Sequence, residues 1–286
     1  MELTGVGIWS SQLRYGDPVE SAEAATELDE MGFSALWIPD VGGPVFDAVG
    51  HLLAATRRTV IATGILNLWM HSPADVADSY ATLTAEHGDR FLLGIGVSHA
   101  PLIDAGQPGR YRRPLAATAS FLDGLDAAPH PVPIKRRVLA ALGPKMLTLS
   151  ATRAGGAHPY LVTPEHTASA RSTLGPSPLL LPEQTVILTN SVDEARRIGT
   201  DWLRSYLALP NYANNLLRTG FTEDDLSQVS DRLFDGIIAW GDEEVVTRRV
   251  AEHRAAGADQ VCVQVLLPDP RVFPREEWRR IAAAFR

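Results

Sequence analysis

The stretch Val138-Leu139-Ala140-Ala141-Leu142-Gly143-Pro144-Lys145-Met146-Leu147 joins an apolar, strand-like run to the start of a helix. Glycine allows a close backbone approach, and proline is favoured in the first helical turn, where its missing N–H is not needed. Such a helix start presents free N–H groups and the positive end of the helix dipole to an anion, and Lys145 adds a cation. If the fold is a barrel of alternating strands and helices, this stretch is a phosphate site at the catalytic mouth.

The alternation of strand and helix patterns continues in both directions from this stretch. Eight apolar segments are typical of strands: 6–10, 35–39, 60–67, 90–97, 137–142, 158–162, 185–189 and 260–266. The segments between them are typical of helices, and three begin with a serine or threonine cap, at Ser72, Thr163 and Ser191. Ser191 and Glu194 are three residues apart, the spacing of a capping box.

Eight strand–helix units in 286 residues favour an α/β protein with a closed (β/α)8 TIM barrel, which we expect to occupy 1–286 as a single domain. The competing architecture is a doubly wound open sheet. Such a sheet more often carries a Gly-x-Gly-x-x-Gly pattern after its first strand, whereas this chain has Ser10-Ser11-Gln12-Leu13 there.

One segment, 208–236, interrupts the pattern before the eighth strand. It is too long for a tight turn and has a partly helical pattern. Insertions on barrels often form lids over the site, so we interpret this segment as a lid. The alternative is a structural cap on the side of the barrel.

Composition bounds the class of protein. The chain has 26 Lys plus Arg against 34 Asp plus Glu, with no basic run, so we expect no nucleic-acid partner. No apolar run approaches the roughly 20 residues that span a bilayer, and Met1-Glu2-Leu3-Thr4 has no basic leader pattern, so we expect no membrane segment. The single cysteine, Cys262, lies in an apolar strand pattern, which fits a buried residue in a reducing cytoplasm.

Candidate functional residues follow from the strand ends, because function in a barrel collects at their carboxyl ends. Those ends carry Asp40, the segment 64–67, the segment 96–99 and the helix start at 143–146, with His71 just beyond. Each has a structural alternative: Asp40 as a helix cap, His71 as a loop residue and His99 as a solvated residue. No metal-ligand cluster and no Gly-x-Ser-x-Gly elbow is present, while Trp9, Trp37 and Trp69 lie where they could wall an aromatic pocket.

The chain resembles the luciferase-like monooxygenase superfamily and, more closely, its branch of coenzyme F420-dependent oxidoreductases. The resemblance covers nearly the whole chain, and it is carried by five stretches: 36–40, 63–67, 90–97, 143–146 and 160–167. It implies a barrel that binds a flavin or deazaflavin at the carboxyl ends of its strands. It also implies a non-prolyl cis peptide in the third strand, which by position is Gly64–Ile65.

The resemblance assigns the remaining cofactor contacts. The phosphate of the cofactor tail is expected at Gly143, Pro144, Lys145 and Met146, where the helix start already pointed. Contacts to the ring or its ribityl chain are expected from Asp40 and Asn67, with Gly96, Val97 and Ser98 passing beside the ring. The chain departs from the sugar-phosphate dehydrogenases of the family, because Val41 and Val97 replace their acid–base histidine and glutamate.

The sequence therefore predicts an oxidoreductase that moves a hydride between coenzyme F420 and a small organic substrate. We take His99 as the first candidate proton donor and His71 as the second, since a histidine of ordinary pKa can serve near neutral pH. The alternatives are an FMN-dependent luciferase-like monooxygenase and a non-catalytic flavin- or deazaflavin-binding protein. The resemblance further implies a homodimer.

Overall fold

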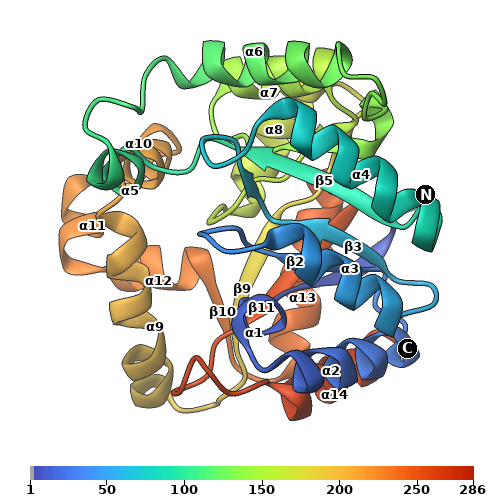
Figure 1. The fold of residues 1–286 in the computed structure, drawn as a ribbon. Helices are drawn as coiled ribbons and strands as arrows, with labels where there is room; N and C mark the ends of the chain where they lie inside the picture. The colour runs from blue at the N-terminus through green and yellow to red at the C-terminus, as the bar shows by residue number, and fades with distance from the viewer. Residues whose placement is uncertain (1–2) are drawn as a thin grey trace.

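Parallel strands form the wall of a barrel, and helices cover its outside (Figure 1). The computed structural model describes residues 3–286; Met1 and Glu2 lie outside the described residues. The strands are β1 (Gly5–Trp9), β2 (Ala35–Ile38), β3 (Val60–Thr63), β4 (Leu66–Asn67), β5 (Phe91–Gly96), β6 (Arg137–Leu139), β7 (Gly156–Ala157), β8 (Leu179–Leu180), β9 (Glu183–Ile187), β10 (Ile238–Trp240) and β11 (Gln260–Val265). They hydrogen-bond in the order β10-β9-β11-β1-β2-β3-β5-β6-β7-β8, with β4 beside β5.

The segment that contains β8 and β9 closes the barrel, because it pairs on both of its edges. On one edge Leu181 N–H donates to the carbonyl of Ala157, the last residue of β7. On the other edge the N–H of Asp259, just before β11, donates to the Leu180 carbonyl. Every strand pair is parallel, including β11 with β1. The predicted (β/α)8 barrel is confirmed, and its strand ends meet at one mouth.

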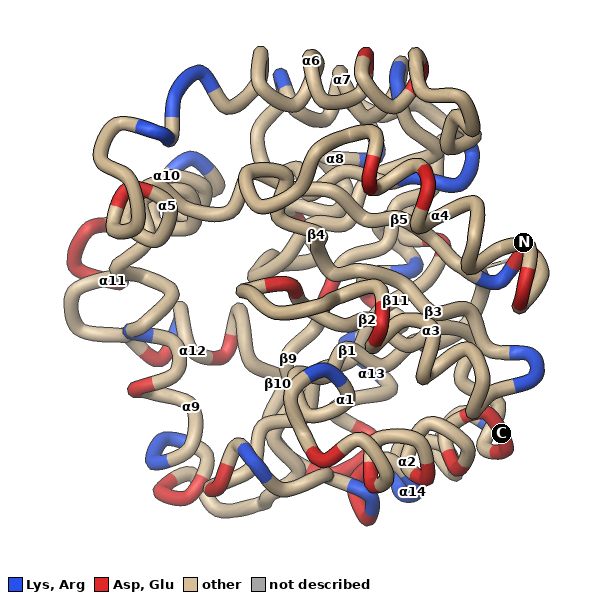
Figure 2. Tube along the Cα trace, viewed as in Figure 1, with Lys and Arg blue, Asp and Glu red and all other residues tan. Residues whose placement is uncertain are grey.

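Fourteen α-helices and one 3-10 helix, Ile134–Arg136, are described between and after the strands in residues 3–286. The α-helices are α1 (Gln12–Tyr15), α2 (Pro18–Met31), α3 (Val45–Ala55), α4 (Pro73–His87), α5 (Ala100–Gly106), α6 (Pro114–Asp126), α7 (Pro144–Arg153), α8 (Pro164–Leu174), α9 (Val192–Leu207), α10 (Pro210–Arg218), α11 (Glu223–Gln228), α12 (Asp231–Ile237), α13 (Glu243–Ala255) and α14 (Arg275–Ala284). None of these helices is both long and apolar enough to cross a lipid bilayer. Charged residues of both signs are spread mainly along the outer helices (Figure 2).

The predicted helix caps are confirmed in part. Ser72 accepts a hydrogen bond from Asp75 N–H, and Thr163 accepts one from His166 N–H, as the sequence indicated. At Ser191 only half of the predicted capping box forms, because the Glu194 carboxylate accepts the Thr189 hydroxyl at 2.5 Å instead of reaching back. The Thr189 hydroxyl in turn accepts from Ser191 N–H at 3.2 Å, so the helix start is satisfied by another route.

The strand boundaries differ from the prediction at the carboxyl half of the chain. The expected strand 158–162 is wrong, since β7 ends at Ala157 and His158 is the first residue beyond it. The expected strand 185–189 is shifted, since β9 covers Glu183–Ile187. Neither the helix α5 nor the strand β10 was expected, because both are short and lack a repeating apolar pattern.

The predicted insertion folds as helices α10, α11 and α12. They share an apolar cluster with the barrel, in which Leu216 and Phe234 of the insertion pack with Ile187 and Ile238. The Arg196 guanidinium of α9 lies 4.1 Å from the centre of the Phe234 ring and covers this cluster from outside. The insertion is thus anchored to the barrel on one side; its function as a lid stays a prediction.

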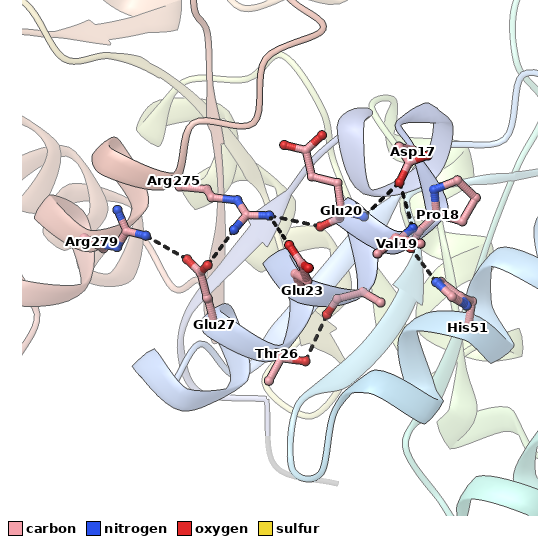
Figure 3. A network of polar contacts seen from close by, with 11 residues as sticks. Asp17, Pro18, Val19, Glu20, Glu23, Thr26, Glu27, His51, Arg275 and Arg279 are labelled. Atoms are coloured by element: carbon pink, nitrogen blue, oxygen red, sulfur yellow. Dashed lines mark hydrogen bonds and ion pairs between the residues drawn. The ribbon is translucent and has the colours of Figure 1, made fainter.

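The last helix, α14, is joined to α2 by ion pairs. Figure 3 shows Arg275 and Arg279 of α14 directed at Glu27 of α2, with N–O distances of 2.6 Å and 3.0 Å. Glu23, one turn earlier on α2, lies 3.5 Å from the Arg275 guanidinium. Because α2 follows β1 and α14 follows β11, this network fastens helices beside the β1–β11 pair.

Candidate functional site

A cavity of about 750 Å³ opens at the carboxyl ends of the barrel strands. Eight of the predicted site residues line it: Asp40, Gly64, Ile65, Val97, Ser98, His99, Gly143 and Met146. The other five do not line it. Asn67 and His71 contact Asp40, Gly96 lies behind Ile65, and Pro144 and Lys145 are exposed in the first turn of α7.

The Gly64–Ile65 peptide bond is cis, as the resemblance implied. The indole N–H of Trp9 donates to the Gly64 carbonyl at 2.9 Å and joins this bulge to the first strand. Gly96 gives the Ile65 side chain room, because a Cβ there would lie 2.6 Å from Ile65 Cδ1 and the side chain would have to shift. The bulge and Trp9 therefore form one wall of the cavity together.

Asp40 is buried at the edge of the cavity and contacts two other predicted site residues, Asn67 and His71. Its carboxylate accepts a hydrogen bond from Asn67 N–H at 3.1 Å and lies 2.8 Å from His71 Nε2. His71 is thus directed at a carboxylate and not into the cavity. Its predicted role as a proton donor is left without a direct path to a ligand in the cavity, and it stays a prediction.

The start of α7 is open, as the sequence predicted for a phosphate site. Gly143 is the N-cap, and no side chain caps the helix. A cation lies there that the sequence analysis missed: the Arg218 guanidinium of α10 donates to the Leu142 carbonyl at 3.2 Å and lines the cavity. Lys145, the predicted cation, does not line the cavity, so the insertion supplies the nearer positive charge.

Aromatic side chains form another wall of the cavity. Tyr160 lies between Trp9 and Tyr206, with ring centres 5.4 Å apart in each pair, and Tyr212 lies 5.5 Å from Tyr206. Burial raises the pKa of Tyr206 to about 12 and that of Tyr160 well above its usual value. The Tyr160 hydroxyl donates to Gln264 Oε1 at 2.6 Å. These hydroxyls stay neutral near pH 7, and the wall is apolar with a few hydrogen-bonding points.

Two of the three predicted tryptophans do not line the cavity. Trp37 is fully buried, and its indole N–H donates to Gln260 Oε1 at 3.1 Å. Trp69 donates to the Val97 carbonyl at 2.8 Å and braces the end of β5 from behind. Only Trp9, at the end of the first strand, has the role that the sequence suggested.

His99 lines the cavity, but its acidity differs from the expectation. Its ring lies 4.8 Å from that of Tyr212, and burial lowers its pKa from 6.5 to about 4. The imidazole is therefore neutral near pH 7, where a histidine of ordinary pKa would be partly protonated.

The insertion touches the strand ends directly. The Asn211 side chain of α10 donates to the Ser98 carbonyl at 3.0 Å, beside Tyr111. Ser98 has a positive φ of 52°, an unusual backbone conformation for a residue other than glycine. Figure 1 shows α5 and α10 next to one another at this end of the barrel. The contact ties the expected lid to the segment that the resemblance places beside the ring.

Glu183 is a buried carboxyl that the sequence analysis did not single out. Its Oε1 accepts the Thr185 hydroxyl at 2.6 Å, and its Oε2 accepts Leu161 N–H at 3.3 Å. Burial raises the pKa of Glu183 from 4.5 to about 7. Within residues 3–286, no three His, Cys, Asp or Glu side chains group so as to hold a metal ion.

The fold and the cavity define a class: TIM-barrel proteins with a ligand site at the carboxyl ends of the strands. Residues 3–128 match the family model of the luciferase-like monooxygenases. A Mycobacterium tuberculosis protein, whose name assigns it provisionally to the coenzyme F420-dependent oxidoreductases, is 25% identical over 119 residues. That alignment covers 41% of this chain and 33% of the relative.

Solved structures share the fold over the whole chain. An F420-dependent secondary alcohol dehydrogenase in complex with an F420–acetone adduct has a TM-score of 0.73 at 16% identity, with 99% of both chains covered. The F420-dependent tetrahydromethanopterin reductase of Methanopyrus kandleri gives the same score and identity, with 100% of both chains covered. The oxygenating constituent of 3,6-diketocamphane monooxygenase from Pseudomonas putida, in complex with FMN, has a TM-score of 0.67 at 12% identity, covering 99% of this chain and 97% of that one.

The resemblance to the luciferase-like monooxygenase superfamily is thereby confirmed, since it rests on sequence over residues 3–128 and on the barrel fold over the remainder. For the F420-dependent branch, the sequence evidence is the likeness to the Mycobacterium tuberculosis protein over 119 residues.

Proposed function

We propose that the protein is a coenzyme F420-dependent oxidoreductase that transfers a hydride between the deazaflavin and a small organic substrate. The observation that carries the proposal is that two features line one cavity. The Gly64–Ile65 bulge and the open start of α7 with Arg218 line the same space. A wall for a flat ring and a seat for an anion are the two features that a phosphate-bearing ring cofactor requires.

The residues present fit such a cofactor. The helix start at Gly143 and the Arg218 guanidinium would hold a phosphate, and the bulge with Trp9 would back a ring. When bound, a deazaflavin supplies a ring carbon that gives or takes a hydride. The chain's own work is to place the reactants and to exclude water, which Trp9, Tyr160 and Tyr212 do with their buried rings.

The charges around the cavity favour an uncharged substrate. Of its lining residues, all within the described part of the chain, Asp40 and Arg218 carry a formal charge at neutral pH. Asp40 is engaged by His71, and Arg218 lies at the proposed phosphate site. The aromatic wall would therefore contact an apolar substrate that has one reducible bond, such as a polarised C=C, C=N or C=O bond.

We keep His99 as the proposed proton donor for such a reduction. It lines the cavity beside Tyr212, and its buried Nδ1 has no hydrogen-bond partner in residues 3–286. A neutral imidazole donates its N–H proton only to a strongly basic product such as an alkoxide or a carbanion. The proposal therefore requires proton transfer after, or together with, hydride transfer.

A second function is supported by the same cavity. A ring and a phosphate are also what FMN presents, and one structural neighbour is an FMN complex of a monooxygenase. The test is titration of the protein with coenzyme F420 and, separately, with FMN, followed by quenching of tryptophan fluorescence, since Trp9 lies at the bulge. Tighter binding of F420 supports the proposal, and a preference for FMN supports the monooxygenase.

Turnover separates an enzyme from a non-catalytic binding protein. Reduced F420 is mixed with a panel of enones, imines and ketones, and its oxidation is followed. Hydride transfer to a member of the panel supports the enzyme, whereas tight binding without transfer to any member supports the non-catalytic binding protein.

We include a cytoplasmic location and a homodimer in the proposal. The single cysteine, Cys262, is buried, which is compatible with a reducing compartment.

A further inference from the structure

His158 has one ring nitrogen without a partner at the floor of the cavity. The residue follows β7, is 1% exposed and lines the cavity. Its ring stacks on Trp37 with centres 4.2 Å apart and planes inclined by 13°. Nδ1 lies 2.6 Å from the Leu181 carbonyl, while Nε2 is buried with no hydrogen-bond partner among residues 3–286.

The contact at Nδ1 fixes the tautomer of His158. A carbonyl oxygen only accepts hydrogen bonds, so Nδ1 must carry the proton. Burial lowers the pKa of His158 from 6.5 to about 4, and the ring therefore carries one proton near pH 7. Nε2 consequently has a lone pair and no hydrogen, which makes it a pure acceptor.

The surroundings of Nε2 direct that acceptor at the bulge. Gly64 is the neighbour, since a Cβ built on it would lie 3.3 Å from His158 Nε2. Because Gly64 has no side chain, none stands between Nε2 and the bulge. Among the described residues His99 and His166 also have an unpartnered buried nitrogen, Nδ1 in each case, and His166 does not line the cavity. His158 differs from His99 because the Leu181 carbonyl fixes its tautomer, so its unpartnered nitrogen is an acceptor.

An unpaired buried acceptor costs about 1–3 kcal/mol, which a ligand with a donor group recovers when it binds. The ring of an oxidised flavin or deazaflavin has one neutral N–H donor, the imide of its pyrimidine part. We propose that His158 Nε2 accepts a hydrogen bond from this imide N–H and so selects for rings that carry it. This inference rests on the proposed function, because it needs a ring cofactor in the cavity.

The test combines a change in the ligand with a change in the protein. FMN and its N3-methyl analogue, in which the imide hydrogen is replaced, are titrated against the wild type and His158→Asn. Asparagine keeps a donor near the Leu181 carbonyl and removes the acceptor at Nε2. The same titrations are made with F420 as the parent ring, because both rings carry the imide.

We expect the wild type to bind the parent ring about fivefold to tenfold more tightly than the methylated ring, the size of one buried hydrogen bond. His158→Asn should weaken binding of the parent ring by the same factor and leave binding of the methylated ring unchanged. If the methyl group merely clashes with the histidine, His158→Asn will instead strengthen binding of the methylated ring and leave binding of the parent ring unchanged. That result overturns the proposal.

His253→Asn is the matched control for the loss of a buried histidine. His253 is 0% exposed, both of its nitrogens have partners in Thr167 and Gln184, and it does not line the cavity. This variant should keep the wild-type preference for the parent ring. If His158→Asn does not fold, equal binding of parent and methylated ring by the wild type alone overturns the inference.

The two proposals fail in different ways. If neither F420 nor FMN binds the folded wild type, the proposed function falls and the inference falls with it. If a ring binds and methylation makes no difference, only the role of His158 is refuted.

Discussion

Replacing Glu183 by glutamine should make the protein more stable at high pH and leave it nearly unchanged at low pH. Glu183 is 1% exposed, and burial raises its pKa from 4.5 to about 7. Glutamine has nearly the same shape. Its amide oxygen can accept Leu161 N–H, and its amide group can donate to the Thr185 hydroxyl, the two partners of the carboxyl.

The magnitude follows from linkage between proton binding and folding. Between pH 4.5 and about 7 the unfolded chain releases the Glu183 proton while the folded protein keeps it. Stability is therefore lost as the pH rises through this window, because the raised pKa favours the folded state only where the carboxyl is protonated. At about 1.4 kcal/mol per pKa unit, the full loss is about 3 kcal/mol above the folded pKa, and about 1 kcal/mol of it is present at pH 5.

The assay is urea unfolding of the wild type and Glu183→Gln at pH 5 and pH 8. The variant should gain about 2 kcal/mol relative to the wild type between the two conditions, a difference in unfolding free energy well above the error of the method. The matched control is Glu30→Gln, because Glu30 is exposed on α2. The reasoning is refuted if the difference between Glu183→Gln and wild type is the same at both pH values.

Three further predictions concern the candidate site. Arg218→Gln should weaken FMN binding about tenfold and riboflavin binding little, because Arg218 lies at the α7 start and riboflavin has no phosphate. Arg204→Gln, which changes an exposed arginine of α9, is the control. Equal losses of affinity for FMN and riboflavin would exclude a phosphate contact. Asp40→Asn should cost about 1–3 kcal/mol of unfolding free energy, since the buried carboxylate accepts a hydrogen bond from Asn67 N–H and contacts His71. Asp78 is exposed, so Asp78→Asn should cost almost nothing. Equal stability of the two variants would contradict this prediction. His99→Gln should slow single-turnover reduction about a hundredfold, with a rate in the wild type that is flat from pH 5.5 to 8 because the pKa of His99 is about 4; an unchanged rate would remove His99 as the donor.

The sequence was a good guide where a signal is local. Ser72 and Thr163 cap their helices as their spacing indicated, and Gly143 begins α7 as the Gly–Pro pair required. Each of these features is decided by residues within one turn of the chain. The cis bond at Gly64–Ile65 was implied by the resemblance alone, since nothing in the residue pattern distinguishes it from an ordinary extended segment.

The sequence failed where a residue acts through a contact with a distant segment. Arg218 reaches Leu142 across 76 residues, and Glu183 is buried beneath Leu161 by the closure of the barrel. Strand β10 has three residues and is held by its pairing with β9, a segment distant in the sequence. Helical or strand periodicity carries no information on such pairings.

His99 and His158 show why a pattern of residue types does not assign chemistry. Both are histidines at the carboxyl ends of strands, and their sequence neighbourhoods gave a role only to His99. Burial gives both a pKa of about 4, but the carbonyl of Leu181 fixes the tautomer of His158 alone. One ring thus becomes a fixed acceptor at the bulge, while the tautomer of the other is free to suit a ligand. The difference lies in a backbone carbonyl 23 residues away, which is visible only once the barrel is closed.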